Sequence, residues 1–204
     1  MAFCGRRSVV GWHRRGGRGE RQIEWHPAAG FPQPGAMETD RLLLRPAQPS
    51  DVDDLRALDA DPEVMRFLGT DGASSVGLIG RDGYWVGIER ATGDFVGWFG
   101  LGDELGYRLR RDKWGLGYAT EGAFAVLRKA FADGLERVTA QTMFVNSGSR
   151  RVLEKLGMRH VRTFHVDWDD PLPGSEHGEV EYEITRAEFT AWPGTTGTAR
   201  PRGR

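Results

Sequence analysis

Two glycines in one short segment constrain this chain more than any other feature. Between Trp114 and Glu121 the sequence reads W-G-L-G-Y-A-T-E, after a strand-like run at 105–109 and before a long helical pattern. The first amides of a helix have no partner inside it, and the positive end of the helix dipole lies there. Gly115 and Gly117 allow backbone conformations that a Cβ would obstruct. The segment therefore predicts a phosphate site formed by the amides of residues 115–119.

Two common nucleotide-binding loops do not match this segment. A Walker loop ends in Gly-Lys-Ser/Thr, which is not found here, and a dinucleotide fingerprint has a third glycine where this chain has Thr120. An ordinary strand-to-helix turn that carries two glycines is the alternative that the residues alone leave open.

The two ends of the chain differ in charge from its middle. Residues 1–36 carry six Arg against two Glu, and residues 193–204 carry three Arg and no acid, while the whole chain has a formal charge of −1. The middle is therefore acidic, which argues against nucleic-acid binding by the folded domain, although the basic ends leave a nucleic-acid adaptor as an alternative. We predict a disordered extension or mis-assigned start at 1–36, one domain at 37–190, and a disordered tail at 191–204.

The chain has no feature that directs it to a membrane, an oxidising compartment or a metal. No apolar run has the length of a signal peptide or a membrane span, and the single cysteine, Cys4, lies in the extension. We therefore expect a cytoplasmic protein without a membrane partner. His165, Asp167, Asp169 and Asp170 alternate as in an exposed strand end, so we predict no metal site.

Hydrophobic periodicity predicts a mixed α/β domain whose ligand loop joins a central strand to its helix. Helices are expected from Ser50, from Pro62, after the glycine loop and after Asn146, with Gly134 and Gly157 ending the last two. Strands are expected at 41–46, 84–88, 95–101, 105–109, 137–144, 158–166 and 180–184.

Four segments in this order resemble the GNAT superfamily of acetyl-CoA-dependent N-acetyltransferases, and within it the ribosomal-protein-acetylating Rim type. They are T-D-R-L-L-L-R-P at 39–46, E-L-G-Y-R-L at 104–109, W-G-L-G-Y-A-T-E-G at 114–122 and N-S-G-S-R-R-V-L-E-K-L-G-M at 146–158. The resemblance covers residues 38–189. It implies one α/β domain with a mostly antiparallel central sheet and helices on both faces. It also implies acetyl-CoA as co-substrate, an amine acceptor (a peptide or protein N-terminus, or a small amine), and a possible homodimer.

The resemblance implies where coenzyme A would bind. The pyrophosphate would lie on the loop of Trp114, Gly115, Leu116, Gly117, Tyr118 and Ala119, in agreement with the helix-terminus argument. The pantetheine arm would pair with the backbone of Tyr107, Arg108 and Leu109, on a strand that splays from its neighbour, and contact Asn146, whose other role is a helix cap. Where the family has Arg or Gln before the loop, this chain has Asp112. Arg110, Arg111 and Lys113 are candidates to restore that positive charge.

The resemblance also implies the groups that carry the chemistry. Ser149 would lie near the thioester sulfur; the family tyrosine that protonates the thiolate is replaced by Leu153, so Ser149, alone or through a water, is the expected acid. A backbone amide of 107–109 would stabilise the oxyanion. Glu104 is the candidate base, because strand alternation places it on the same face as Arg108, although a surface ion pair with Arg108 is its alternative role.

One alternative to an enzyme remains from the sequence. The absence of the family tyrosine and the short segment after Phe67, on the acceptor side of the pocket, would also suit a non-catalytic acyl-CoA-binding sensor or interaction module. Release of coenzyme A thiol in the presence of amines would distinguish the enzyme from the non-catalytic module.

Glu121 lies in the first helical turn after the loop, and its carboxylate is expected to be stabilised by the helix dipole.

Overall fold

The described part of the chain comprises residues 2–3, 35–68, 74–168 and 170–193 of a computed structural model. Its strands are β1 (Ala2–Phe3), β2 (Met37–Glu38), β3 (Leu42–Pro46), β4 (Tyr84–Glu89), β5 (Phe95–Leu101), β6 (Leu105–Leu109), β7 (Arg137–Met143), β8 (Arg159–Phe164) and β9 (Glu179–Thr185). Its helices are α1 (Val52–Ala60), α2 (Pro62–Met65), α3 (Tyr118–Ala132), α4 (Ser147–Lys155) and α5 (Arg186–Ala191). Short 3₁₀ turns are η1 (Pro49–Asp51), η2 (Ser75–Leu78), η3 (Arg111–Lys113) and η4 (Ser175–His177).

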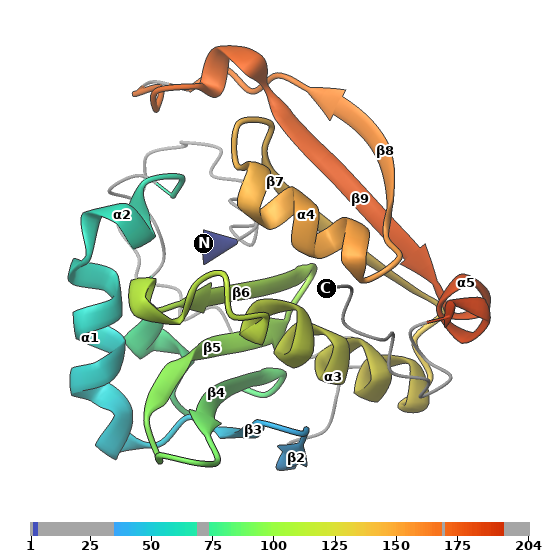
Figure 1. The fold of residues 1–204 in the computed structure, drawn as a ribbon. Helices are drawn as coiled ribbons and strands as arrows, with labels where there is room; N and C mark the ends of the chain where they lie inside the picture. Colours follow the sequence, from blue (N-terminus) through green and yellow to red (C-terminus); the bar gives the residue numbers. More distant parts are fainter. Residues whose placement is uncertain (1, 4–34, 69–73, 169, 194–204) are drawn as a thin grey trace, which may run out of the picture.

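The strands form two antiparallel sheets. Six strands pair in the order β1-β6-β5-β4-β3-β2, and three pair in the order β7-β9-β8. Within the described residues, β6 and β7 are not hydrogen-bonded to each other, and the strands of the two sheets run in different directions (Figure 1). The sequence predicted one central sheet; the division occurs where β6 ends and the glycine loop leads into α3.

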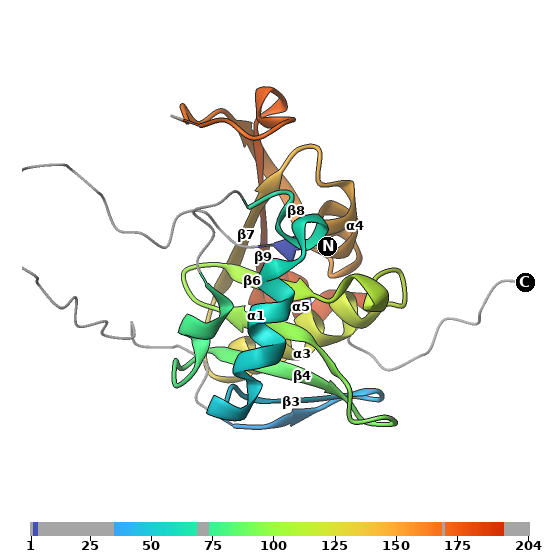
Figure 2. The same ribbon diagram turned by 90° about the vertical axis from the view of Figure 1, so that its left-hand side faces the viewer.

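Alternating side chains on the strands form a core on each face of the larger sheet. Trp85 and Phe99 belong to the core that also holds α3, whereas Val86 and Trp98 belong to the core that also holds α1. Neighbours in a strand point to opposite faces, so each of these strands is buried on both sides. Helices therefore cover both faces, with α3 in front of the sheet in Figure 1 and α1 toward the viewer in Figure 2. This confirms the predicted α/β class.

Most predicted elements lie within a residue or two of their expected bounds. The helix α5 was not predicted, although Thr185 and Glu188 form a capping box at its start. The predicted extension and tail fall mostly outside the described residues, so their boundaries stay predictions. The described part includes residues 2–3 and 35–36 of the extension and 191–193 of the tail, and Ala2–Phe3 pairs antiparallel with β6.

The described residues contain neither a membrane-spanning helix nor a cluster of metal-binding side chains. None of the helices found there has the length and apolar character needed to cross a bilayer. Within the same residues, no three His, Cys, Asp or Glu side chains gather into a group that would hold a metal ion. Of the polar residues after β8, Asp169 lies outside the described part, and His165 contacts the carbonyl of Glu176 through Nε2 at 3.2 Å.

Candidate functional site

The glycine loop has the backbone that an anion cradle requires. Gly115 and Gly117 have φ values of +74° and +88°, in the left-handed region that other residues avoid. Gly117 is the N-cap of α3, and the amide of Glu121 donates to its carbonyl at 3.1 Å. The amides of residues 118–120 precede this bond, so they have no acceptor within the helix. The positive end of the helix dipole therefore faces the space in front of the loop.

An ion pair fastens the loop to the start of β3. Glu121 accepts from Thr39 Oγ1 at 2.6 Å, and from the backbone N and side-chain Nε of Arg41 at 2.8 and 2.7 Å. Arg41 Nη1 also donates to the carbonyl of Leu116 at 2.9 Å. Burial acts to raise the pKa of Glu121, but the bonds from Thr39 and Arg41 outweigh it and lower that pKa. The carboxylate thus holds the first turn of α3 as well as complementing its dipole.

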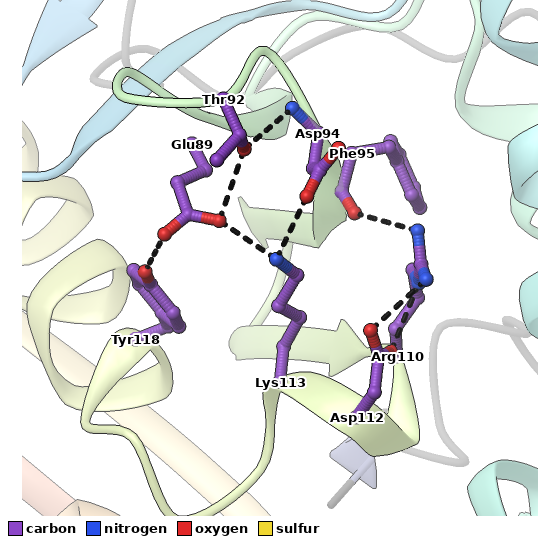
Figure 3. Close-up of polar contacts among 8 residues, drawn as sticks. All are labelled: Glu89, Thr92, Asp94, Phe95, Arg110, Asp112, Lys113 and Tyr118. Atoms are coloured by element: carbon purple, nitrogen blue, oxygen red, sulfur yellow. Dashed lines mark hydrogen bonds and ion pairs between the residues drawn. The ribbon is translucent and has the colours of Figure 1, made fainter.

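Lys113 is held by carboxylates of the β4–β5 hairpin, as Figure 3 shows. Its Nζ lies 2.7 Å from Glu89 Oε2 and 3.2 Å from Asp94 Oδ2, while the other oxygen of Glu89 accepts from the Tyr118 hydroxyl. The hydrogen bonds from Lys113 and Tyr118 lower the pKa of Glu89 to about 2. They also raise the pKa of Lys113 and that of Tyr118. The charge of Lys113 is therefore already balanced.

The positive charge of Arg110 is likewise balanced by a carboxylate. Its Nε and Nη2 each lie 3.0 Å from an oxygen of Asp112, the residue that departs from the family pattern. Of the three basic residues considered for the missing positive charge, two thus have carboxylate partners. Arg111 is the third, and it has no ion pair with any described residue; it is exposed beside a cleft of about 630 Å³ between α1, α2 and η3.

The edge of β6 that faces away from β5 presents the backbone groups of only every second residue. Arg110 donates its backbone N–H to Val96 of β5 at 3.0 Å, and Arg108 lies opposite Trp98 of β5. Because backbone groups alternate between the two edges of an antiparallel strand, those of Arg108 face β5, whereas those of Tyr107 and Leu109 face the other edge. The carbonyl of Leu109 accepts from the Trp114 indole at 2.9 Å. Beside Tyr107 that edge pairs with β1.

The start of α4 brings three polar side chains together. Asn146 caps the helix by accepting from Ser149 N at 3.2 Å, and its Nδ2 donates to Thr142 at 3.1 Å. The hydroxyls of Ser149 and Tyr107 lie 3.0 Å apart, and both residues are fully buried. Burial raises the pKa of Tyr107 far above its usual range, so this phenol stays protonated. Sequence reasoning used only the backbone of Tyr107 and missed this contact, for which no local signal exists.

The opposite face of β6 carries a buried arginine. Arg108 is fully buried; its Nη1 pairs with Asp59 of α1 and lies 3.0 Å from Ser75 Oγ. The alternative role considered for Glu104, an ion pair with Arg108, is thus taken by Asp59. Glu104 itself is half-buried in the turn between β5 and β6.

A cleft opens beside the start of α4. Its volume is about 460 Å³, and its walls come from α2, the glycine loop, the N-terminal end of α4 and the turn at η4. The lining residues are Glu63, Arg66, Phe67, Trp114, Val145, Asn146, Ser147, Gly148, Pro173, Gly174 and His177. Two predicted site residues, Trp114 and Asn146, therefore share one cleft.

Comparison with known proteins identifies the family. A sequence model of the acetyltransferase (GNAT) domain matches residues 41–159. The chain belongs to the GNAT acetyltransferase family. It is 37% identical over 183 residues to the FsC-acetyl coenzyme A-N(2)-transacetylase of Aspergillus fumigatus, an alignment covering 75% of this chain and 77% of the relative.

Solved GNAT structures have the same fold. A GNAT-family acetyltransferase from Bacillus anthracis, 24% identical, aligns with a TM-score of 0.62 over 75% of this chain and 99% of its own. Spermidine N-acetyltransferase from Vibrio cholerae, in complex with CoA and spermine, is 13% identical and aligns with a TM-score of 0.63 over 74% of this chain and 99% of its own. As a GNAT enzyme, the chain is an acetyl-CoA-dependent N-acetyltransferase, with acetyl-CoA as its co-substrate.

Proposed function

We propose that this GNAT enzyme moves the acetyl group of acetyl-CoA onto a small amine. The observation that carries the choice of acceptor is the relative that shares 37% identity, whose name describes acetyl transfer from coenzyme A to an N(2) nitrogen. A peptide or protein N-terminus, as in the ribosomal-protein-acetylating Rim type, is the alternative acceptor. The catalytic domain is proposed to span 37–190.

The diphosphate of coenzyme A is proposed to lie on the glycine loop. The left-handed Gly115 and Gly117 open the backbone, and the amides of residues 118–120 offer donors at the positive end of α3. The nearby Lys113 and Arg110 are already paired with carboxylates. The backbone cradle, rather than a cationic side chain, is therefore the main source of attraction.

The pantetheine arm is proposed to add to the edge of β6 that faces away from β5. Tyr107 and Leu109 direct their backbone groups to that edge, so they are the partners we assign, while Trp114 already caps the carbonyl of Leu109. β1 pairs with the same edge at Tyr107 and Arg108. Because one backbone group cannot serve both, binding of pantetheine requires that β1 leave. Asn146 would contact the arm from the start of α4.

The amine then attacks the acetyl carbon, and the C–S bond breaks as the C–N bond forms. The attacking nitrogen loses a proton, for which Glu104 is the proposed base, and the departing sulfur gains one. Ser149 is the proposed donor of the proton to sulfur, and its hydroxyl takes a proton from solvent after the thiol has left. If the Tyr107 hydroxyl donates to Ser149 Oγ across the 3.0 Å contact, the hydrogen of Ser149 is left to point at the sulfur. Tyr107 is thus a positioning residue, and the amide of Tyr107 or Leu109 is proposed to stabilise the oxyanion.

Calorimetry with acetyl-CoA, followed by a thiol-release assay across small amines and peptides, tests the proposal. We expect saturable binding and release of coenzyme A with at least one small amine. Binding without turnover of any acceptor would favour the non-catalytic sensor or module instead. No heat of binding would remove the assigned cofactor site.

A further inference from the structure

The donors of Arg108 are only partly used. Its guanidinium carries five N–H groups, and Nη1 directs its two toward Asp59 and Ser75. The remaining nitrogens, Nε and Nη2, are buried and have no hydrogen-bond partner among the residues that the structure describes. Leaving buried donors of a charged group unpaired costs stability, and such groups in a native protein call for an explanation. The unused edge is the one that binds carboxylates through two parallel bonds.

The surrounding contacts hold this edge in place. Ser75 Oγ donates to Asp59 at 2.6 Å and accepts from the Trp98 indole at 2.9 Å, and Ser75 N donates to Asp59 at 2.6 Å. The guanidinium carbon also lies 5.5 Å from the centre of the Trp98 ring. Asp59 thus has two donors from Ser75 besides Arg108, so the second edge of the arginine is not needed to neutralise it. The guanidinium is thus held in place, and three of its five N–H donors have no partner among the described residues.

The position of Arg108 connects it to the reaction. Its neighbours Tyr107 and Leu109 direct their backbone to the edge proposed for pantetheine, whereas the Arg108 side chain extends toward α1 and η2. The acceptor amine would attack a thioester held on that edge of β6. Its substituents would then lie on the face of β6 that carries the Arg108 side chain. A planar anion attached next to the amine is the group that a buried guanidinium fork recognises best.

We propose that the Nε–Nη2 edge of Arg108 binds a carboxylate of the acceptor, so that the substrates are amines carrying a carboxylate, as in amino acids. The proposal rests on the proposed N-acetyltransferase function and names its substrate class. Asp59 and Ser75 are positioning residues, because they hold the guanidinium and do not contact the acceptor.

The test compares acceptors that differ only in the carboxylate. For wild type, kcat/KM is measured for several L-amino acids, for their amides, and for the corresponding amines without the carboxyl group. A charge-assisted pair contributes roughly 1.5–3 kcal/mol, so the acids should be favoured by roughly 10- to 150-fold. Arg108→Lys keeps the charge but lacks the fork, and the preference should fall by at least about 10-fold, mainly through KM.

Two controls keep the outcome interpretable. The preference is a ratio within one variant, so partial unfolding of Arg108→Lys does not change it. Arg45→Lys weakens another arginine–aspartate pair of the same sheet, with Asp51, and should leave the preference unchanged. Equal rates for acids and amines in wild type, or the same preference in Arg108→Lys, would overturn the assignment.

A second readout does not need turnover. N-acetylated amino acids are products of the proposed reaction, so they should raise the Tm of wild type and protect Arg108→Lys less. Amines acetylated without any preference for a carboxylate would overturn the role of Arg108 while leaving the transferase proposal intact. No turnover of any acceptor would count against the transferase proposal, and failure of the acidic products to protect wild type would count separately against the Arg108 site.

Discussion

Replacing Gly117 by valine should separate the cost of a strained backbone from the loss of the anion cradle. Gly117 has φ +88°, and a left-handed L-residue costs about 1–2 kcal/mol, so Tm should fall by roughly 2–8 °C for a domain of this size. A built Cβ would lie 3.2 Å from Arg41 Nη2 and crowd the side chain that fastens the loop. Loss of one bond to the diphosphate is worth about 1.5–3 kcal/mol, or roughly 10- to 150-fold in Kd.

Gly134 provides a matched control at the other end of the same helix. Its φ is +109°, and the 15-residue helix α3, about 22 Å long, separates it from Gly117. Gly134→Val should therefore lower Tm by a similar amount without changing the Kd for acetyl-CoA. Calorimetry is run with acetyl-CoA and with acetyl-pantetheine, which lacks the diphosphate. Only acetyl-CoA should lose affinity in Gly117→Val; equal Kd values for wild type and this variant would refute the assigned diphosphate site.

Three further predictions concern the proposed acid Ser149, the strand β1 and the carboxylate of Glu89. Ser149→Ala should lower kcat about 100-fold with little change in the Kd for acetyl-CoA, and Tyr107→Phe should lower kcat roughly 2- to 12-fold; equal loss of kcat and affinity would make Ser149 a binding residue. A chain of residues 37–204 lacks β1 and should bind acetyl-CoA more tightly than the full chain; an unchanged Kd would show that β1 does not compete. Glu89→Gln should destabilise the protein above pH 4.5, and this difference should shrink as the pH falls toward 2, because the folded state lowers the pKa of Glu89 from 4.5 to about 2. Chemical denaturation of both proteins across this range measures it, and a difference that does not vary with pH would contradict the assigned bonds.

The sequence predicted the helices, the strands and the glycine loop because each depends on residues that lie close together in the chain. The hairpin between β4 and β5, the helix after the glycines and the cap at Asn146 all follow from residues a few positions apart. The missed helix α5 also had a local signal, the Thr185–Glu188 capping box, which sequence reasoning overlooked. The GNAT resemblance supplied the fold beyond these elements, and the family match confirms it.

The polar contacts of the site depend on distant parts of the chain. The Tyr107 and Ser149 hydroxyls meet across 42 positions, and the pair of Arg108 with Asp59 spans 49. Neither follows from periodicity, which assigns a face to a side chain but not its partner. The expectation that Lys113 would supply free positive charge missed Glu89 for the same reason, since that contact depends on how the β4–β5 hairpin lies against the loop.

The ion pair between Arg41 and Glu121 explains how a loop with two glycines can remain ordered. Glycine loses more conformational freedom on folding than any other residue, so a cradle built from it needs outside support. Arg41 supplies that support from β3 by contacting Glu121, the Leu116 carbonyl and, at 4.4 Å, the Tyr118 ring. Each contact leaves the amides of residues 118–120 untouched. The loop therefore loses its conformational entropy during folding rather than on binding. This preorganisation strengthens the binding of an anion to the amides of residues 118–120.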